Sequence, residues 1–316
     1  MCKVTISTYE FFKKFPDENT ARLHLEKKRW NSKAVCPKCG CIESQWKQSR
    51  DGKDGYFRCG HCESVYTVRT GTIMERSHVP LHKWLYAIYM VVTARKGISS
   101  LQLSKEIGIT QKSAWFLLQR IREACRKDDD NDQGGGGSLH GIVEVDETYI
   151  GGKETNKHAS KKLNGGRGTV GKIAVIGMRQ RAGGKLKAAL LSSTSKIALQ
   201  TAVLTAVAHG STLCTDEHSG YKGMEGIYNH RTVNHSAKQY VDGMAHTNGI
   251  ESVWAVLKRG FYGIYHSFSE KHLNRYIAEF AFRLNDGNCK VHTLDRIDAF
   301  LGKIASARIT YKTLTA

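Results

Sequence analysis

The stretch HTNGIESVWAVLKR, residues 246–259, has the apolar spacing of a helix that packs against a larger core. Its apolar residues and the phenylalanine that follows share one helical face: Ile250, Val253, Trp254, Leu257 and Phe261. Glu251 and Lys258, seven residues apart, fall nearly one above the other along the edge of this face, with Asn248 beside them. They either form a surface ion pair or belong to a site to which other segments contribute acids.

Before this helix, the chain has the alternating pattern of strands at five places, with one helical segment among them. The strands are predicted at residues 142–150, 172–181, 185–193, 211–218 and 227–235, and the helix at 195–210. This order predicts an α/β domain of the ribonuclease-H-like fold, with a mixed five-stranded sheet and helices. In that topology the first and fourth strands lie side by side.

Two aspartates are expected at the same edge of that sheet. Asp146 stands late in the first strand, on the same face as Glu144, and Asp216 ends the fourth. The helix that carries Glu251 is expected to pack against this edge and to bring a third carboxylate. Three hard oxygen ligands in a basic surround suit two divalent cations, Mg²⁺ or Mn²⁺, that promote an in-line displacement at phosphorus.

The N-terminal part contains two CxxC pairs, separated by nineteen residues, which is the spacing of a zinc ribbon. Each pair offers two thiolates on one tight turn, and the two turns complete a tetrahedral site for a structural Zn²⁺: Cys36, Cys39, Cys59 and Cys62. Cys41 and His61 lie close enough in sequence to be rival ligands. Nine cysteines in an intracellular chain favour metal over disulfides.

From Pro80 the pattern becomes helical, with stops at Gly97 and Gly108 and a cap at Thr110. A short helix, a glycine turn and a longer helix predict a helix-turn-helix. The last helix turns an apolar stripe inward: Ala114, Leu117, Leu118, Ile121 and Cys125. It leaves outside a polar set suited to DNA: Gln111, Lys112, Ser113, Trp115, Gln119, Arg120 and Arg122. A three-helix connector with a solvated basic face is the alternative.

These motifs divide the chain into six parts. We expect an N-terminal helical segment (1–33), a zinc ribbon (34–76), a helix-turn-helix domain (77–127), a linker (128–138), a catalytic domain (139–290) and a helical tail (291–316). The linker, DDDNDQGGGGS, has the composition of a flexible connection, natural or introduced. The tail is expected to cover the sheet.

The net charge of the chain indicates which kind of partner it binds. With 48 Lys and Arg against 29 Asp and Glu, the net charge is +19, which favours a polyanion such as DNA over a neutral ligand. Ribosomal or membrane-surface binding would give a similar charge. The longest apolar run, Leu85 to Val92, is too short to cross a bilayer. We therefore expect a cytoplasmic, nucleoid-associated protein with no membrane partner.

Taken together, the motifs resemble those of the DDE-superfamily transposases, most closely the bacterial Merlin-like insertion-sequence group. The matching pieces are RLHLEKKRW, CPKCG, RCGHC, VRTGT, LHKWLYAIYM, VEVDETYIGGKE, TDEHSGY, HTNGIESVWAVLKRGFYGIYH and EFAFRLN, spread over nearly the whole chain. Glu251 follows Asp216 by thirty-five residues and Lys258 follows by seven more, as the third acid and its basic neighbour do in that superfamily. Members of this group are also described with Asn as third residue, which makes Asn248 a rival for Glu251.

The resemblance implies a metal-dependent DNA transposase. Such an enzyme binds the terminal inverted repeats of its element, cleaves the ends and joins the freed 3′-hydroxyl to target DNA as a homodimer or higher assembly. The resemblance assigns catalysis to Asp146, Asp216 and Glu251, with Lys258 and Arg259 near the phosphates. The alternatives are a DNA-binding regulator whose ribonuclease-H-like domain is inactive, and a nuclease without strand transfer.

Overall fold

The computed structural model describes residues 4–31, 33–43, 45–50, 53–126, 139–152, 158–163, 168–233, 246–305 and 309–315. The chain forms two compact units, one of residues 1–127 with 286–316 and the other of residues 128–285. The expected linker at 128–138 lies outside the described residues. Each unit is therefore considered by itself.

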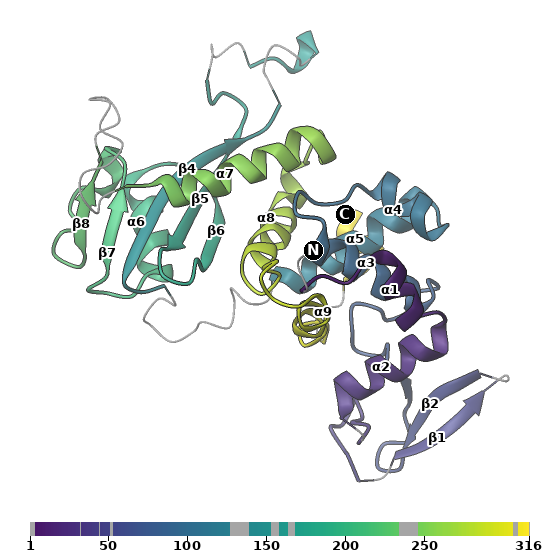
Figure 1. Ribbon diagram of the computed structural model, residues 1–316. Helices are drawn as coiled ribbons and strands as arrows, with labels where there is room; N and C mark the ends of the chain where they lie inside the picture. Colours follow the sequence, from purple (N-terminus) through teal and green to yellow (C-terminus); the bar gives the residue numbers. More distant parts are fainter. Residues whose placement is uncertain are drawn as a thin grey trace. The chain divides into compact units, whose positions relative to one another are not determined.

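The first unit begins with α1 (Thr8–Lys14) and α2 (Glu18–Trp30) (Figure 1). A capping box starts α1, because Ser7 and Glu10 exchange side-chain and backbone hydrogen bonds. Asp17 caps α2 by accepting from the Thr20 amide. Both helices lie in the segment expected to be helical, residues 1–33.

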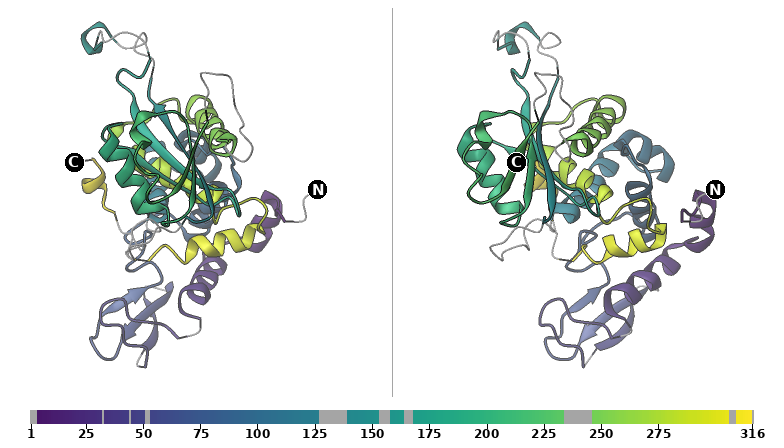
Figure 2. Two further views of the ribbon diagram at one scale, coloured as in Figure 1. Left: turned by 90° about the vertical axis from the view of Figure 1, so that its left-hand side faces the viewer. Right: turned by 60° about the vertical axis from the view of Figure 1, so that its left-hand side comes forward.

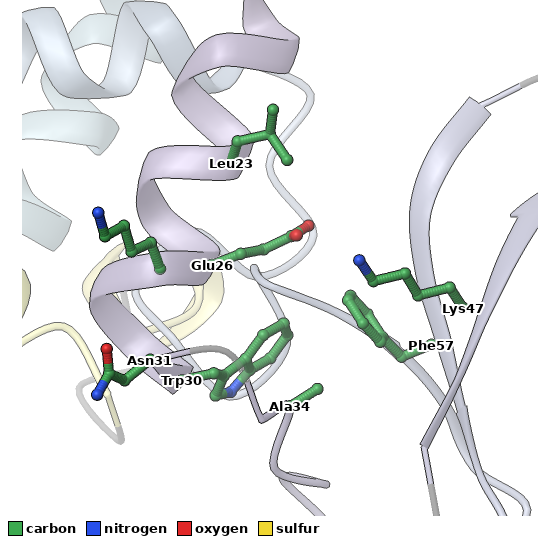
Figure 3. Close-up of a pocket in the computed structure, with 8 residues that line it drawn as sticks. Leu23, Glu26, Trp30, Asn31, Ala34, Lys47 and Phe57 are labelled. Atoms are coloured by element: carbon green, nitrogen blue, oxygen red, sulfur yellow. The ribbon is translucent and has the colours of Figure 1, made fainter.

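The ribbon that follows is a three-stranded antiparallel sheet of β1 (Gln45–Arg50), β2 (Lys53–Cys59) and β3 (Val65–Thr67), in that order. Three aromatic rings join it to α2: Trp30 meets Phe57 at 5.0 Å and Tyr66 at 5.8 Å between centroids. A pocket of about 300 Å³ opens between α2 and the hairpin, with Glu26 and Trp30 on one side and Lys47 and Phe57 on the other (Figure 3). The ribbon is thus braced on α2 by aromatic packing.

The helix-turn-helix is formed by α3 (Leu81–Thr93), α4 (Ser100–Ile107) and α5 (Gln111–Arg126). Ser99 caps α4, and Gly108 ends it in the left-handed conformation at φ 62°. The first helix ends at Thr93, earlier than the predicted stop at Gly97. The predicted inward stripe of α5 is confirmed, because all five of its residues are buried: Ala114, Leu117, Leu118, Ile121 and Cys125.

The C-terminal tail belongs to the first unit, so the prediction that it covers the five-stranded sheet is wrong. It contains α9 (Thr293–Leu301) and the short α10 (Tyr311–Thr315). Helix α9 packs on α2 and α3, and the buried Arg296 donates to the carbonyl oxygen of Val92. Two backbone bonds add to this attachment, from Thr293 to Val4 and from Ile73 to Ile304. The apolar face of the tail has its partner in α3, far away in sequence.

The second unit is built on a five-stranded mixed sheet with the order β6-β5-β4-β7-β8. The strands are β4 (Ile142–Ile150), β5 (Ile173–Gln180), β6 (Leu186–Leu191), β7 (Thr212–Thr215) and β8 (Asn229–Thr232). Strands β4, β5 and β6 are antiparallel, while β7 pairs in parallel with β4 and β8. The predicted fold class and the predicted neighbourhood of the first and fourth strands are both confirmed.

Helices cover both faces of this sheet (Figure 2). On one face, α6 (Lys196–Ala206) shares a core with Val143, Val145 and Ile176. On the other, α7 (Asn248–Gly260) and α8 (Glu270–Leu284) pack on Val175 and Leu186. A π-helical turn, η4 (Phe261–Tyr265), joins α7 to the chain before α8. Short 3-10 turns occur as η2 (Ala159–Lys161) and η3 (Ser219–Tyr221).

Candidate active site

Two aspartates meet because β4 and β7 are parallel neighbours. The pairing aligns Val143 with Leu213 and Glu144 with Cys214. Continuing this register by two residues brings Asp146 level with Asp216, which directly follows β7. One carboxylate oxygen from each of Asp146, Glu147 and Asp216 lies within 4.8 Å of the other two. Three acids from two strands therefore converge at one point of the sheet.

Glu147 is the member of this group that the sequence reasoning missed. Neighbouring residues of a strand point to opposite faces, so strand alternation by itself does not bring Asp146 and Glu147 into one site. The Glu147 carboxylate accepts a hydrogen bond from the hydroxyl of Tyr221, a fully buried residue of η3. The only signal in the sequence was the adjacency of the two acids in VEVDET. Tyr221, which follows β7, holds the Glu147 carboxylate beside Asp216, and this contact cannot be read from the strand pattern.

The crowding of acids changes their proton affinities. Burial, together with the charges of Glu147, Asp216 and Glu251, raises the pKa of Asp146 to about 7. Burial also raises the pKa of Glu147 to about 7, with Asp216 adding to the shift and Tyr221 opposing it. Hard carboxylate oxygens that repel one another in a half-buried place are the donor set that a divalent cation stabilises. The residues present therefore fit Mg²⁺ or Mn²⁺.

Glu251 stands beside this group, in the first turn of α7. Its carboxylate accepts a hydrogen bond from the Thr247 hydroxyl at 2.9 Å, and its charge contributes to the raised pKa of Asp146. Asn248 is the first residue of α7, and both Asn248 and Glu251 are exposed. Glu251 is thus an acid near the three converging carboxylates and not one of the tight group.

Helix α7 is tied to Asp146 directly. The indole nitrogen of Trp254 donates to Asp146 Oδ2 at 3.1 Å. This approach requires Gly177, which lies opposite Asp146 on β5, because a Cβ there would come within 2.5 Å of the Trp254 ring. One carboxylate oxygen of Asp146 is therefore oriented by the protein, and the other can serve a ligand. Further along α7, Lys258 and Arg259 are exposed in the last turn.

The cysteines form a separate cluster in the ribbon, where all four sulfur atoms lie within 4.8 Å of one another. Sγ of Cys36 and Cys62 are 3.6 Å apart, as are those of Cys39 and Cys59. A tetrahedral site with Zn–S bonds of about 2.3 Å requires sulfur separations of about 3.8 Å, so the geometry fits zinc. A hydrogen bond from the Cys62 backbone is the main cause that lowers the pKa of Cys59 to about 6, which favours the thiolate.

The DNA-facing set predicted on α5 is only partly available. Gln111, Lys112 and Ser113 are exposed at its N-terminus, and Trp115 is half-buried. Three members of the predicted set are buried instead: Gln119, Arg120 and Arg122. The Arg120 guanidinium donates to the carbonyl oxygens of Glu75 and Ile309. The prediction is therefore wrong for the C-terminal half of α5, because residues from elsewhere in the first unit cover that face.

Two family models match the chain. Residues 16–65 match the transposase zinc-ribbon domain, and residues 138–285 match the ISXO2-like transposase domain. The two matches belong to one transposase family and together cover more than half of the chain. The chain belongs to the DDE-type insertion-sequence transposases. As a transposase it acts on DNA, and its acidic cluster and cysteine cluster fit a metal-dependent polynucleotidyl transferase with a zinc ribbon.

The transposase is also similar to individual proteins. It is 26% identical over 281 residues to an uncharacterized protein in transposable element ISH50 of Halobacterium salinarum, covering 86% of this chain and 92% of the relative. A chain from the simian T-cell lymphotropic virus intasome in complex with PP2A regulatory subunit B56 gamma aligns with 62% of the transposase and 68% of its own length. That alignment has 13% identity and a TM-score of 0.29, which is too low to support a conclusion.

One further observation concerns membranes. Within the part of the transposase that the structure describes, none of the helices combines the length and the apolar character needed to span a bilayer.

Proposed function

We propose that this transposase binds the terminal inverted repeats of its element, cleaves the ends and joins the freed 3′-hydroxyl to target DNA. The convergence of Asp146, Glu147 and Asp216, with Glu251 close by, is the observation that supports this proposal. Divalent cations held there would act as Lewis acids for phosphoryl transfer. In the first step a water oxygen bonds to phosphorus and the 3′-oxygen leaves. In the second, that 3′-hydroxyl attacks a target phosphodiester and displaces another 3′-oxygen.

The positions of the residues suggest a role for each of them. Asp146 and Asp216 would provide the shared cation ligands, and we favour Glu251 over Asn248 as the third because a carboxylate is the better ligand for Mg²⁺. Glu147, held by Tyr221, would add a further oxygen beside Asp216. Lys258 and Arg259, exposed on the same helix as Glu251, would contact phosphates near the cations.

We further propose that the N-terminal end of α5 contacts the inverted repeats through Gln111, Lys112, Ser113 and Trp115. In a helix-turn-helix, residues near the start of the helix after the turn, here α5, are those that reach base edges in the major groove. The joining reaction needs two ends at once, so we propose that the active species is a dimer or a higher assembly on DNA.

The test is an incubation of the full-length protein with Mg²⁺ and DNA that carries the element's end sequences. We expect cleaved and joined products from the wild type. Asp146→Asn should lower both by about two orders of magnitude or more, because the cation contributes several kcal/mol to transition-state stabilisation. Glu270→Gln, an exposed change at the start of α8, is the matched control and should leave both products unchanged.

The same assay separates the alternatives. Cleaved products without joined products would indicate a nuclease that lacks strand transfer. Binding without either product, equal in the wild type and in Asp146→Asn, would overturn the enzymatic proposal and favour a DNA-binding regulator.

A further inference from the structure

A third carboxylate on β4, beside those of Asp146 and Glu147, has no place in the reaction described above, yet it is among the most buried charged groups of the second unit. Glu144 is 1% exposed and lies two residues before Asp146, on the same face of the strand. A buried carboxylate is stable only when hydrogen bonds and an opposite charge compensate for its lost hydration. Arg181 supplies the charge, with Nε 3.0 Å from Glu144 Oε1.

The other oxygen of Glu144 is used on helix α7. The backbone N–H of Ile250 donates to Glu144 Oε2 at 2.9 Å. Ile250 is the third residue of α7, so its N–H is one of those at the start of a helix that have no partner within the helix. A negative charge at this end is also favoured by the helix dipole. Glu144 therefore holds the first turn of α7 to the central strand.

The surrounding residues are arranged around this contact. Arg181 also donates to the carbonyl oxygen of His246, which fixes the chain as it enters the helix. A Cβ at position 249 would lie 2.4 Å from Glu144 Oε2 and 2.5 Å from a guanidinium nitrogen of Arg179, so a larger residue there would displace these two side chains. His246 Nδ1 lies 3.4 Å from the same carboxylate. Helix α7 and strand β4 are thus so close at position 249 that a methyl group there would contact the side chains of both Glu144 and Arg179.

The turn held by Glu144 is the one that carries Glu251. The amide of Glu251 donates to the Thr247 carbonyl oxygen at 3.0 Å, and the Thr247 hydroxyl donates to the Glu251 carboxylate. One turn later, Trp254 donates to Asp146. Strand β4 therefore grips α7 at two points, through Glu144 and Asp146, and the position of Glu251 depends on both.

We propose that Glu144, paired with Arg181, is a positioning residue that fixes the first turn of α7 so that Glu251 can share a divalent cation with Asp146. This inference rests on the proposed function, since it assigns Glu144 a task at that same site. It predicts a specific coupling: loss of Glu144 should weaken cation binding only while Glu251 is present.

The test measures Mn²⁺ binding to the zinc-loaded, full-length protein by titration calorimetry, without DNA. Glu144→Gln keeps the shape of the side chain and removes its charge. We expect it to weaken Mn²⁺ binding by about tenfold or more, the usual effect of removing a residue that orients a metal ligand. In a Glu251→Gln background the same change should have an effect of less than about twofold, because the carboxylate that Glu144 is proposed to position is no longer there. Glu270→Gln is the control.

A second variant covers the case in which Glu144→Gln fails to fold. Gly249→Ala leaves the charge of Glu144 in place and adds the methyl group for which there is no room. It should weaken Mn²⁺ binding in the same way, and hydrogen exchange of the Ile250 amide should become faster in the metal-free protein. A change that only lowered overall stability would accelerate exchange across the sheet as well.

The outcomes distinguish this inference from the proposed function. If Asp146→Asn abolishes Mn²⁺ binding but neither Glu144→Gln nor Gly249→Ala alters it, the role of Glu144 is wrong and the active site stands. Equal losses with and without Glu251 would also overturn the positioning role. If the wild type binds no Mn²⁺, or binds it as well as Asp146→Asn does, both proposals fail.

Discussion

At the scale of single residues, the site depends on a glycine and two buried aromatic side chains as much as on its acids. Gly177 makes room for Trp254, and Trp254 orients Asp146. Tyr221 does the same for Glu147 from a buried turn. These contacts fix the carboxylates close together in a largely buried place, and burial, with the charges of the neighbouring acids adding to it, raises the pKa values of Asp146 and Glu147.

The raised pKa values predict how stability depends on pH. Asp146 and Glu147 have pKa values of about 7 in the folded protein, against about 4 when unfolded. Between these values the folded state holds protons that the unfolded state has released, so the free energy of unfolding falls as pH rises from about 4 to about 7. Mg²⁺ binds the deprotonated carboxylates of the folded protein, so it should offset this decrease in the free energy of unfolding.

The measurement is the melting temperature with and without Mg²⁺ at about pH 5.5 and at about pH 8. We expect the increase caused by Mg²⁺ to be larger at the higher pH, and to disappear in the Asp146→Asn, Glu147→Gln double variant. An equal increase at both pH values would contradict the assignment of these two groups.

A second prediction concerns Gly177→Ala. The added methyl group would lie 2.5 Å from the Trp254 ring, so the ring has to move and its hydrogen bond to Asp146 is lost. We expect unfolding by urea to show a destabilisation of about 1–3 kcal/mol, as for other overpacked cores. Gly263→Ala, with open space around its Cβ position, is the control and should lose less than half of that amount.

At the scale of elements, the ribbon is a sheet of three short strands with two pairs of cysteines. One pair lies in the turn before β1, and the other lies where β2 ends and turns toward β3. The four cysteines lie at distances suited to zinc, and Cys41 is outside the cluster. The aromatic contacts between α2, β2 and β3 are few. A domain this small depends on its metal for most of its stability.

Substitution of single cysteines tests which of them bind zinc. Cys59→Ser should reduce bound zinc from about one per chain to near zero, because a structural site requires all four ligands. Cys41→Ser should keep the metal. Elemental analysis of protein purified without chelators gives the count, and equal zinc contents in the two variants would show that the ligand set is different.

Helix α5 allows another comparison between neighbours on one element. Lys112 is exposed near its N-terminus, while Arg120 is buried against the carbonyl oxygens of Glu75 and Ile309. Lys112→Ala should weaken binding to the element's ends and reduce the slope of log affinity against log salt by about 1. Arg120→Ala should leave that slope unchanged and destabilise the first unit by about 1–3 kcal/mol.

At the scale of the whole molecule, the chain begins and ends in the same unit, with the second unit inserted between. Helix α9 buries Ile297 and Phe300 completely and packs on α2 and α3. Helices α2, α3 and α9 therefore pack together within the first unit, and the sheet with its acids has a core of its own.

This organisation predicts which part of the chain a substitution in the tail will destabilise. Phe300→Ala should destabilise the first unit by about 3–5 kcal/mol, as for other aromatic residues removed from a core. Hydrogen exchange should then accelerate in α3 and not in β4 or β5. Asp295→Ala, exposed on the same helix, is the control. Faster exchange in β4 would mean that the two units unfold together.

The features that the sequence determined by itself are those with a local or periodic signature. The CxxC pairs, the order of the strands, the apolar stripe of α7 and the meeting of Asp146 with Asp216 could all be predicted, because period and spacing follow from backbone geometry. The tertiary structure alone decided the rest. Glu147 joins the acids through Tyr221, Arg120 is covered by distant carbonyl oxygens, and α9 packs on α3. Each of these depends on contacts between residues far apart in the chain, and such contacts leave no period in the sequence.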